Sequence, residues 1–176
     1  MKNPSSVLLL VLLLLVVGCS DNEDSISGTI KIGSNTYAIK NAYYSVEVEE
    51  DGDDKYYMYS VYFFSEGLKV IKKDKTIDDV TGLGAMSYAY FEGNDAKGLD
   101  VGKFSYSFLV AVEITKEDTL SYVNYGLPVE VKKSSSGNAI NYMFKGLDDN
   151  EEENGELVTV SFTGKVSRIE PVKEGN

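Results

Sequence analysis

The chain contains no histidine, no tryptophan and a single cysteine among its 176 residues. Without histidine it cannot build a Ser-His-Asp triad, a Cys-His pair, or a His-ligated zinc or haem centre. With one cysteine it cannot form an internal disulfide, so the fold must depend on its hydrophobic core. These absences favour a protein that is not an enzyme.

Positive charge is also scarce. Lysine and arginine total 17 against 28 acidic residues, which gives a formal net charge of −11 and a pI of about 4.5. Nucleic-acid binding requires a basic face, so no nucleic-acid partner is expected. Composition leaves open a glycosidase, which needs only two carboxylates about 5–10 Å apart. It is the least favoured hypothesis, because the acids cluster in expected turns rather than facing a cleft.

The longest apolar run, Val7 to Val17, is too short to cross a membrane as a helix, which takes about 20 residues. Its length suits the apolar region of a secretory signal, with Gly18 and Cys19 at the cleavage boundary. The sequence predicts a signal peptide over 1–18, a lipidated cysteine with an acidic tether over 19–26, an all-β domain over 27–170 and a tail over 171–176. An ordinary signal peptide is the alternative.

The motif "VVGC" resembles the lipobox of bacterial lipoproteins. That resemblance implies diacylglycerol and an N-acyl chain such as palmitate on Cys19, and attachment to a membrane through this anchor. The acidic stretch "SDNEDS" behind it resembles the export signal of surface lipoproteins of the Bacteroidetes. The expected location is therefore the outer membrane, facing the cell exterior. The periplasmic face is the alternative.

Apolar and polar residues alternate with period two along most of the remaining chain, which is typical of β-strands. The pattern predicts about nine strands, at 28–32, 36–40, 43–50, 55–64, 85–91, 103–115, 128–133, 139–146 and 156–166. Residues 65–84 are predicted to be a long connection with at most a short strand, and 116–126 are ambiguous. The pattern indicates a single antiparallel β-sandwich, with a calycin-like β-barrel as the alternative.

The same alternation indicates which side chains face the core. Along 85–91 the larger residues Met86, Tyr88 and Tyr90 fall on one side, and we expect that side to face inward. Larger residues also align along 103–115. The two C-terminal strands are expected to point two sets inward, which are Ile140, Tyr142 and Phe144, and Val158, Val160 and Phe162.

Three longer stretches carry a second resemblance: "GTIKIGSNTYAIKNAYY", "GLDVGKFSYSF" and the terminal segment from "PVEVKK" to "SFTGKV". Together they are similar to a loosely defined set of small Bacteroidetes-type surface lipoproteins. The resemblance covers most of 27–168 and implies an all-β domain with no assigned activity. It brings no catalytic residues, and the acidic insert "DDNEEENGE" departs from the tight turn usual in that set.

Two acidic clusters, at 49–54 and 148–156, could supply oxygen ligands to Ca²⁺. Asp51, Asp53 and Asp54 are the candidate ligands of the first cluster. Neither cluster has the spacing of a known Ca²⁺ loop, because the glycine of the sharp turn is misplaced. Solvated turns that keep the surface soluble are the alternative interpretation.

The sequence also holds 13 tyrosines and 7 phenylalanines. Tyr43, Tyr57 and Tyr59 lie opposite the apparent inward faces of their strands, so they are candidates for an exposed aromatic patch. Such a patch could stack sugars or contact a protein, although burial in the core is the alternative for most of these rings. The sequence thus favours a non-catalytic surface binding module for a glycan, cation or protein. A structural or assembly subunit of an envelope complex or surface appendage is the alternative.

Overall fold

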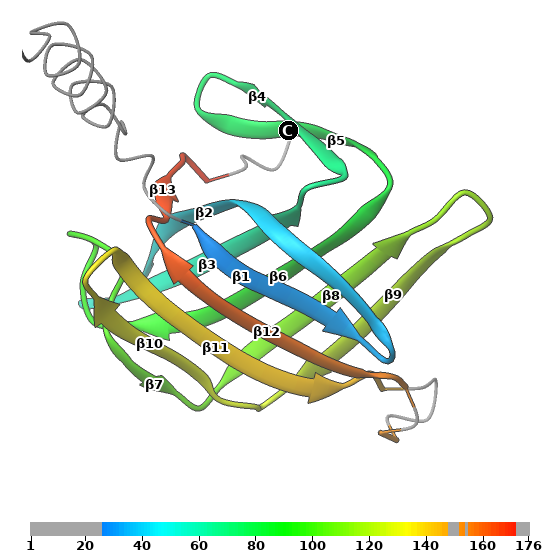
Figure 1. The fold of residues 1–176 in the computed structure, drawn as a ribbon. Helices are drawn as coiled ribbons and strands as arrows, with labels where there is room; N and C mark the ends of the chain where they lie inside the picture. The colour runs from blue at the N-terminus through cyan, green and yellow to red at the C-terminus, as the bar shows by residue number, and fades with distance from the viewer. Residues whose placement is uncertain (1–25, 148–151, 154, 172–176) are drawn as a thin grey trace, which may run out of the picture.

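The computed structural model describes residues 26–147, 152–153 and 155–171, and this part of the chain is all-β (Figure 1). The strands are β1 (Ser27–Ile32), β2 (Asn35–Asp51), β3 (Asp54–Ser65), β4 (Leu68–Lys73), β5 (Thr76–Gly82), β6 (Gly84–Gly93), β7 (Gly102–Phe104), β8 (Ser107–Ile114), β9 (Thr119–Tyr125), β10 (Val129–Ser134), β11 (Gly137–Lys145), β12 (Leu157–Gly164) and β13 (Ser167–Arg168). The prediction of an all-β fold is confirmed.

Eleven strands form one large sheet that folds into two layers. The first layer holds β7, β10, β11, β12 and β1, and the second holds β3, β6, β8 and β9 (Figure 1). Strand β2 joins them, because its start pairs with β1 and its later part with β3, with a register shift between Ile39 and Asn41. A bulge bends a strand and lets it pass from one layer to the other. In the described chain the end strands β7 and β9 do not pair, so the two layers make a sandwich rather than a closed barrel.

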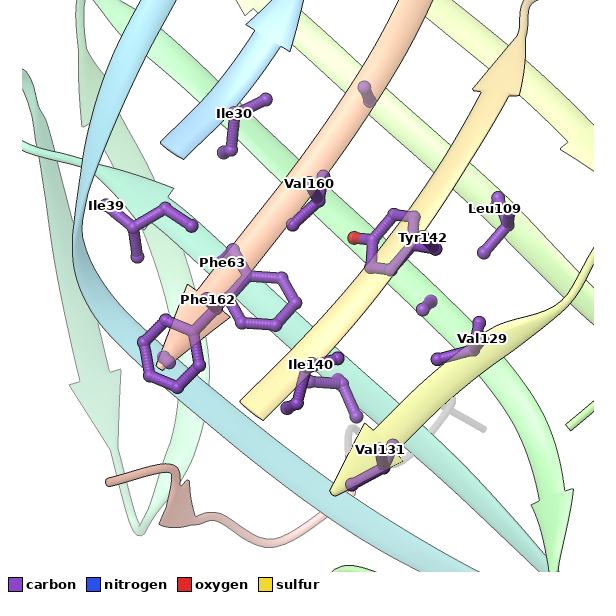
Figure 2. Close-up of a cluster of buried hydrophobic side chains, with 14 of the residues drawn as sticks. Ile30, Ile39, Phe63, Leu109, Val129, Val131, Ile140, Tyr142, Val160 and Phe162 are labelled. Carbon is purple, nitrogen blue, oxygen red and sulfur yellow. The ribbon is translucent and has the colours of Figure 1, made fainter. Parts of the chain in front are cut away.

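The core lies between the layers (Figure 2). Phe63 of β3 meets Phe162 of β12 with ring centroids 5.2 Å apart, and meets Tyr142 of β11 at 6.2 Å. The Tyr142 hydroxyl donates to Ser87 Oγ at 2.8 Å, so a buried polar group links the two layers. Burial raises the pKa of Tyr142, which keeps this donor protonated.

The inward faces predicted for the last two long strands are confirmed. Ile140, Tyr142 and Phe144 of β11 are buried, as are Val158, Val160 and Phe162 of β12. The opposite sides of both strands carry Asn141, Thr159, Ser161 and Thr163, so the alternation marks the inward sides even though Met143 and Leu157 also face outward.

The inward face predicted for 85–91 was wrong. Ala85, Ser87, Ala89 and Phe91 of β6 are buried, whereas Met86, Tyr88 and Tyr90 lie half-buried on the outer side. The inner side has small residues because Phe63 of β3 stands opposite Ser87 and fills the space between the layers. Neither side of β6 carries a charge before Glu92. The prediction therefore rested on side-chain size alone, and size pointed to the wrong side.

The prediction of one strand over 103–115 was also wrong. β7 pairs with β10 in the first layer and β8 pairs with β6 in the second, so the chain changes layers between them. Leu109 and Ala111 of β8 are buried, and Phe108 points outward on the other side of the strand. Residues 36–50 were expected as two strands but continue through the bulge as one.

Residues 65–84, expected to be mainly a connection, form the β4–β5 hairpin (Figure 1). Asp74 and Lys75 make its turn with φ of 49° and 68°, as a two-residue hairpin turn requires. The hairpin is a separate two-stranded sheet that packs on the outer side of the second layer. Leu68 and Phe64 lie in this second small core with Tyr43 and Ile169.

Candidate functional site

The three tyrosines predicted as a patch lie on different sides of the second layer. Tyr59 is fully buried, where it stacks on Phe91 with centroids 5.7 Å apart, and the carbonyl oxygens of Asp95 and Gly98 share the single proton of its hydroxyl as acceptors. Tyr57 packs half-buried against the same core. Tyr43 is buried on the opposite side under the β4–β5 hairpin. These rings therefore do not form one exposed patch.

The acidic candidates lie at the turn between β2 and β3. Asp51, Asp53 and Asp54 are all exposed. The described residues contain no group of three or more acidic, His or Cys side chains placed to hold a metal ion, so the geometry adds no support for Ca²⁺ binding. Asp148, Asp149 and Glu151 of the second cluster lie outside the described residues, as does Cys19.

An aromatic surface does exist, on the outer side of the second layer. We call it the aromatic face, and it consists of Tyr62 (β3), Tyr88 and Tyr90 (β6), Phe108 (β8) and Tyr125 (β9). The sheet register joins them, because Tyr62 lies opposite Tyr88, Tyr90 opposite Phe108, and Phe108 opposite Tyr125. Directly opposite residues in an antiparallel pair share one side of the sheet.

The rings of the aromatic face contact one another. Tyr88 is their centre, with centroid distances of 5.0 Å to Tyr62, 6.3 Å to Tyr90 and 6.4 Å to Phe108. Phe108 is 41% exposed and Tyr125 is 52% exposed, while the other three rings are half-buried. Large rings left in solvent on adjacent strands of a monomer mark an interaction surface more often than a chance arrangement.

Carboxylates border the aromatic face at its end near the β2–β3 turn. Glu47 and Glu49 of β2 lie on the same side, and the Tyr90 hydroxyl donates to Glu49 Oε1 at 3.4 Å. Burial and the negative charge of Glu49 raise the pKa of Tyr90 to about 12, so its hydroxyl stays protonated at neutral pH. The described strand positions on this side, between the hairpin and the β2–β3 turn, include no Lys or Arg. They are Ser45, Glu47, Glu49, Tyr56, Met58, Ser60, Tyr62, Tyr88, Tyr90, Glu92, Phe108, Val110, Val123 and Tyr125.

The β4–β5 hairpin bounds one end of the aromatic face. Its Lys72 places Nζ 4.8 Å from the ring centroid of Tyr43, beside Tyr62 on the same side of the sheet. An ammonium group over a tyrosine ring is attracted by the negative face of the ring. The fold thus already uses this side of the sheet to hold one cation.

Strand edges, the other feature through which a β-protein joins a partner, are guarded. The edge of β9 is closed because Leu147 N donates to Val123 O at 2.9 Å and Asn124 Nδ2 donates to Lys145 O at 2.8 Å. At the other end of the large sheet, β7 has only three residues. The free strands of the hairpin carry Lys and Asp side chains, which discourage pairing with another chain.

One buried carboxylate lies apart from the aromatic face, at one end of the sandwich. Glu113 of β8 accepts a hydrogen bond from Asn35 Nδ2 at 2.8 Å and another from the Tyr37 hydroxyl. Burial and this hydrogen bond raise the pKa of Tyr37 to about 12. Glu113 therefore ties β8 to β2 across the two layers through two neutral donors, and we assign it a structural role.

Comparisons with protein-family models, curated proteins and solved structures find no match for this chain. The described part contains no helix long and apolar enough to cross a membrane. The class that fold and site define is thus an acidic two-layer β-domain with an aromatic outer face.

Proposed function

We propose that the protein is a non-catalytic binding module displayed on a membrane surface, and that the aromatic face contacts its ligand. The observation that carries the proposal is the continuous set of rings across β3, β6, β8 and β9, with carboxylates beside it. Tyr62 also packs against the small core under the hairpin, whereas Phe108 and Tyr125 are exposed and available to a ligand.

The chemistry of the face favours a basic protein surface as the ligand. Ring faces are electron-rich and attract Lys and Arg side chains, and Glu47 and Glu49 add negative charge beside them. The face is a broad side of a sheet that spans four strands, a shape that suits another protein surface. Tyrosine and phenylalanine are also enriched where proteins meet.

Display on the membrane follows from the expected lipid on Cys19. A short acidic tether over 19–26 then leads to β1, which begins at Ser27. Replacing Cys19→Ala should move the protein from the membrane fraction to the soluble fraction, because the acyl chains supply the attachment. Fractionation and immunoblotting measure this. A variant that stays in the membrane fraction would refute the lipid anchor without touching the proposal for the aromatic face.

The aromatic face can be tested with matched peptides. The full chain, in a polyoxyethylene detergent that carries no sugar or charge, is titrated with oligolysine and with the same peptide acetylated on every side chain. Because the chain has no tryptophan, tyrosine dominates its fluorescence, and four of its 13 tyrosines lie on the aromatic face, so binding there should change the signal. We expect oligolysine to bind at least tenfold more tightly than the acetylated peptide, since acetylation removes the charge.

The variants separate the aromatic face from the general acidity of the chain. Tyr88→Ala should weaken binding about two- to thirtyfold, because cation–π contacts contribute about 0.5–2 kcal/mol. Glu49→Gln and Glu117→Gln each remove one exposed negative charge, the first beside the aromatic face and the second in the turn between β8 and β9. If both glutamine variants lost affinity for oligolysine equally and Tyr88→Ala lost none, the attraction would be non-specific and the proposal would be refuted.

The alternative is an assembly subunit that is permanently bound through the same surface. Half-buried Val110 and Val123 extend the aromatic face as a flat apolar surface, which favours this alternative. A stable interface buries about 1,200–2,000 Å² in total. Native electrophoresis of detergent-solubilised membranes distinguishes the two. A permanent complex that Tyr88→Ala dissociates indicates assembly, and a monomer that binds basic peptides reversibly indicates the binding module.

A further inference from the structure

The first layer carries a groove that is independent of the aromatic face. It lies on the outer side of β10, β11 and β12, has a volume of about 530 Å³, and is lined by Lys103, Pro128, Glu130, Asn141, Tyr142, Met143, Thr159, Val160 and Ser161. Figure 1 shows these strands side by side on the opposite layer from β3 and β6. Volumes of this size are typical of sites for small organic ligands.

The floor of the groove has a polar row. Lys103 lies opposite Glu130, Glu130 opposite Asn141, and Asn141 opposite Ser161, so four polar side chains follow one line across β7, β10, β11 and β12. Neighbouring strands are about 4.8 Å apart, so these groups recur at about that step. Such a step is comparable with the length of one sugar ring in a linear chain.

Beside the polar row runs a less polar one. Met143, which is 58% exposed, lies opposite Thr159, and Pro128 lines the same side of the groove. A pyranose ring has the same two-sided character, with hydroxyl groups around its edge and C–H groups on its faces. The two rows of the groove thus match the two chemistries of a sugar.

A second hollow continues the groove. It has a volume of about 320 Å³ and shares Lys103 with the first. Its lining includes Tyr106, which at 89% is the most exposed large hydrophobic side chain in the described part of the molecule. Aromatic rings that project from a groove wall are suited to stacking on the apolar face of a ligand ring.

The groove is close to electrically neutral on a strongly acidic chain. Glu130 pairs with Lys132 at 2.8 Å, and Lys103 lies opposite Glu130 in the neighbouring strand. Ser161 Oγ donates to Asn141 Oδ1 at 2.9 Å, so the amide oxygen is engaged and its N–H groups are the donors left to recognise a ligand. Neutral hydroxyl groups fit this environment better than a charged ligand does.

We propose that this groove binds a neutral linear oligosaccharide that lies across the strands. The polar row from Lys103 to Ser161 hydrogen-bonds its hydroxyls, the row of Pro128, Met143 and Thr159 contacts the apolar C–H face of its rings, and Tyr106 stacks on a further sugar. The groove lies on a different layer from the aromatic face, and only the second hollow, with Tyr106, reaches the end of β6 at Glu92 and Gly93. Loss of one site therefore leaves the other testable.

The experiment uses the full chain in the same sugar-free detergent. Isothermal titration measures binding of neutral hexasaccharides of β-1,4-glucan, α-1,4-glucan, β-1,4-mannan and β-1,4-xylan. At least one should bind, and Asn141→Ala and Ser161→Ala should each weaken it about three- to tenfold, the range that one hydrogen bond provides. Tyr106→Ala should weaken the hexasaccharide more than the corresponding disaccharide, because the ring serves the far end of the groove.

Two matched controls keep the result interpretable. Thr163→Ala changes the same side of β12 outside the groove, and Tyr88→Ala changes only the aromatic face, so both should bind the hexasaccharide as the parent chain does. Circular dichroism shows that each variant is folded. The proposal is overturned if none of the four hexasaccharides binds. It is equally overturned if folded Asn141→Ala, Ser161→Ala and Tyr106→Ala all bind with unchanged affinity.

Discussion

At the scale of single residues, one buried amide closes the edge of the second layer. Asn124 of β9 is 4% exposed, and its Nδ2 donates to Lys145 O at 2.8 Å while its Oδ1 accepts from Tyr125 N at 2.6 Å. It thus satisfies one main-chain N–H of the edge strand β9 and one carbonyl at the end of β11, which lies beside that edge. A buried polar side chain is retained when its hydrogen bonds are complete.

Replacing Asn124→Ala should therefore lower the free energy of unfolding by about 1–3 kcal/mol, because a carbonyl and an amide lose their partners. Thermal unfolding should show a decrease of several degrees, and light scattering should show more self-association through the opened edge. Asn141→Ala provides the control, since Asn141 is half-exposed and should change the melting temperature little. Equal melting temperatures for both variants would show that Asn124 does not close the edge.

At the scale of elements, the strands with one polar side were predictable and the central strands were not. In β11 and β12 most outward residues are polar, such as Asn141, Thr159 and Ser161, so the inward faces follow from the sequence although Met143 and Leu157 also face outward. β6 and β8 carry few charges on either side because the hairpin and the aromatic face make their outer sides apolar too. For such strands, period-two alternation shows which residues share a side but not which side faces the core.

The aromatic face and the groove were less predictable than the fold, because each site depends on the strand register. Tyr62, Tyr88 and Phe108 come from three strands that are far apart in sequence, and only the pairing brings their rings together. The small residues Ala85, Ser87 and Ala89 were a usable signal, because they alternate with the outward tyrosines of β6. The groove had no signal of its own, as its polar row takes one residue from each of four strands.

At the scale of the whole molecule, the two layers present different chemistry. The outer side of the second layer is aromatic and acidic, whereas the groove on the first layer is polar and close to neutral. A surface module with this arrangement could hold a glycan on one side and a basic protein on the other. The proposed sites can be tested in one titration series, with each ligand added before and after the other.

The absence of histidine also fixes how the stability of the whole molecule depends on pH. No side chain of the domain titrates with an ordinary pKa between about pH 6 and 9, so the free energy of unfolding should stay nearly constant there. At higher pH, loss of tyrosine protons changes the free energy of unfolding. Burial, followed by the charges of Asp100 and Asp95, raises the pKa of Tyr59 to about 12 from 10.0.

Above pH 10 the unfolded chain loses tyrosine protons that the folded chain keeps, so stability must fall as pH rises toward 12. For fully buried Tyr59 the shift corresponds to at most about 2.7 kcal/mol. Denaturant unfolding from pH 6 to 12 should show a plateau and then a steep decrease. Tyr59→Phe should cost stability at pH 7, because it removes the hydroxyl proton that the carbonyl oxygens of Asp95 and Gly98 share, yet make the decrease shallower. Tyr106→Phe, at an exposed ring, is the control and should leave the curve unchanged. A decrease that begins near pH 7 would contradict this account, because no group in the described domain is expected to titrate there.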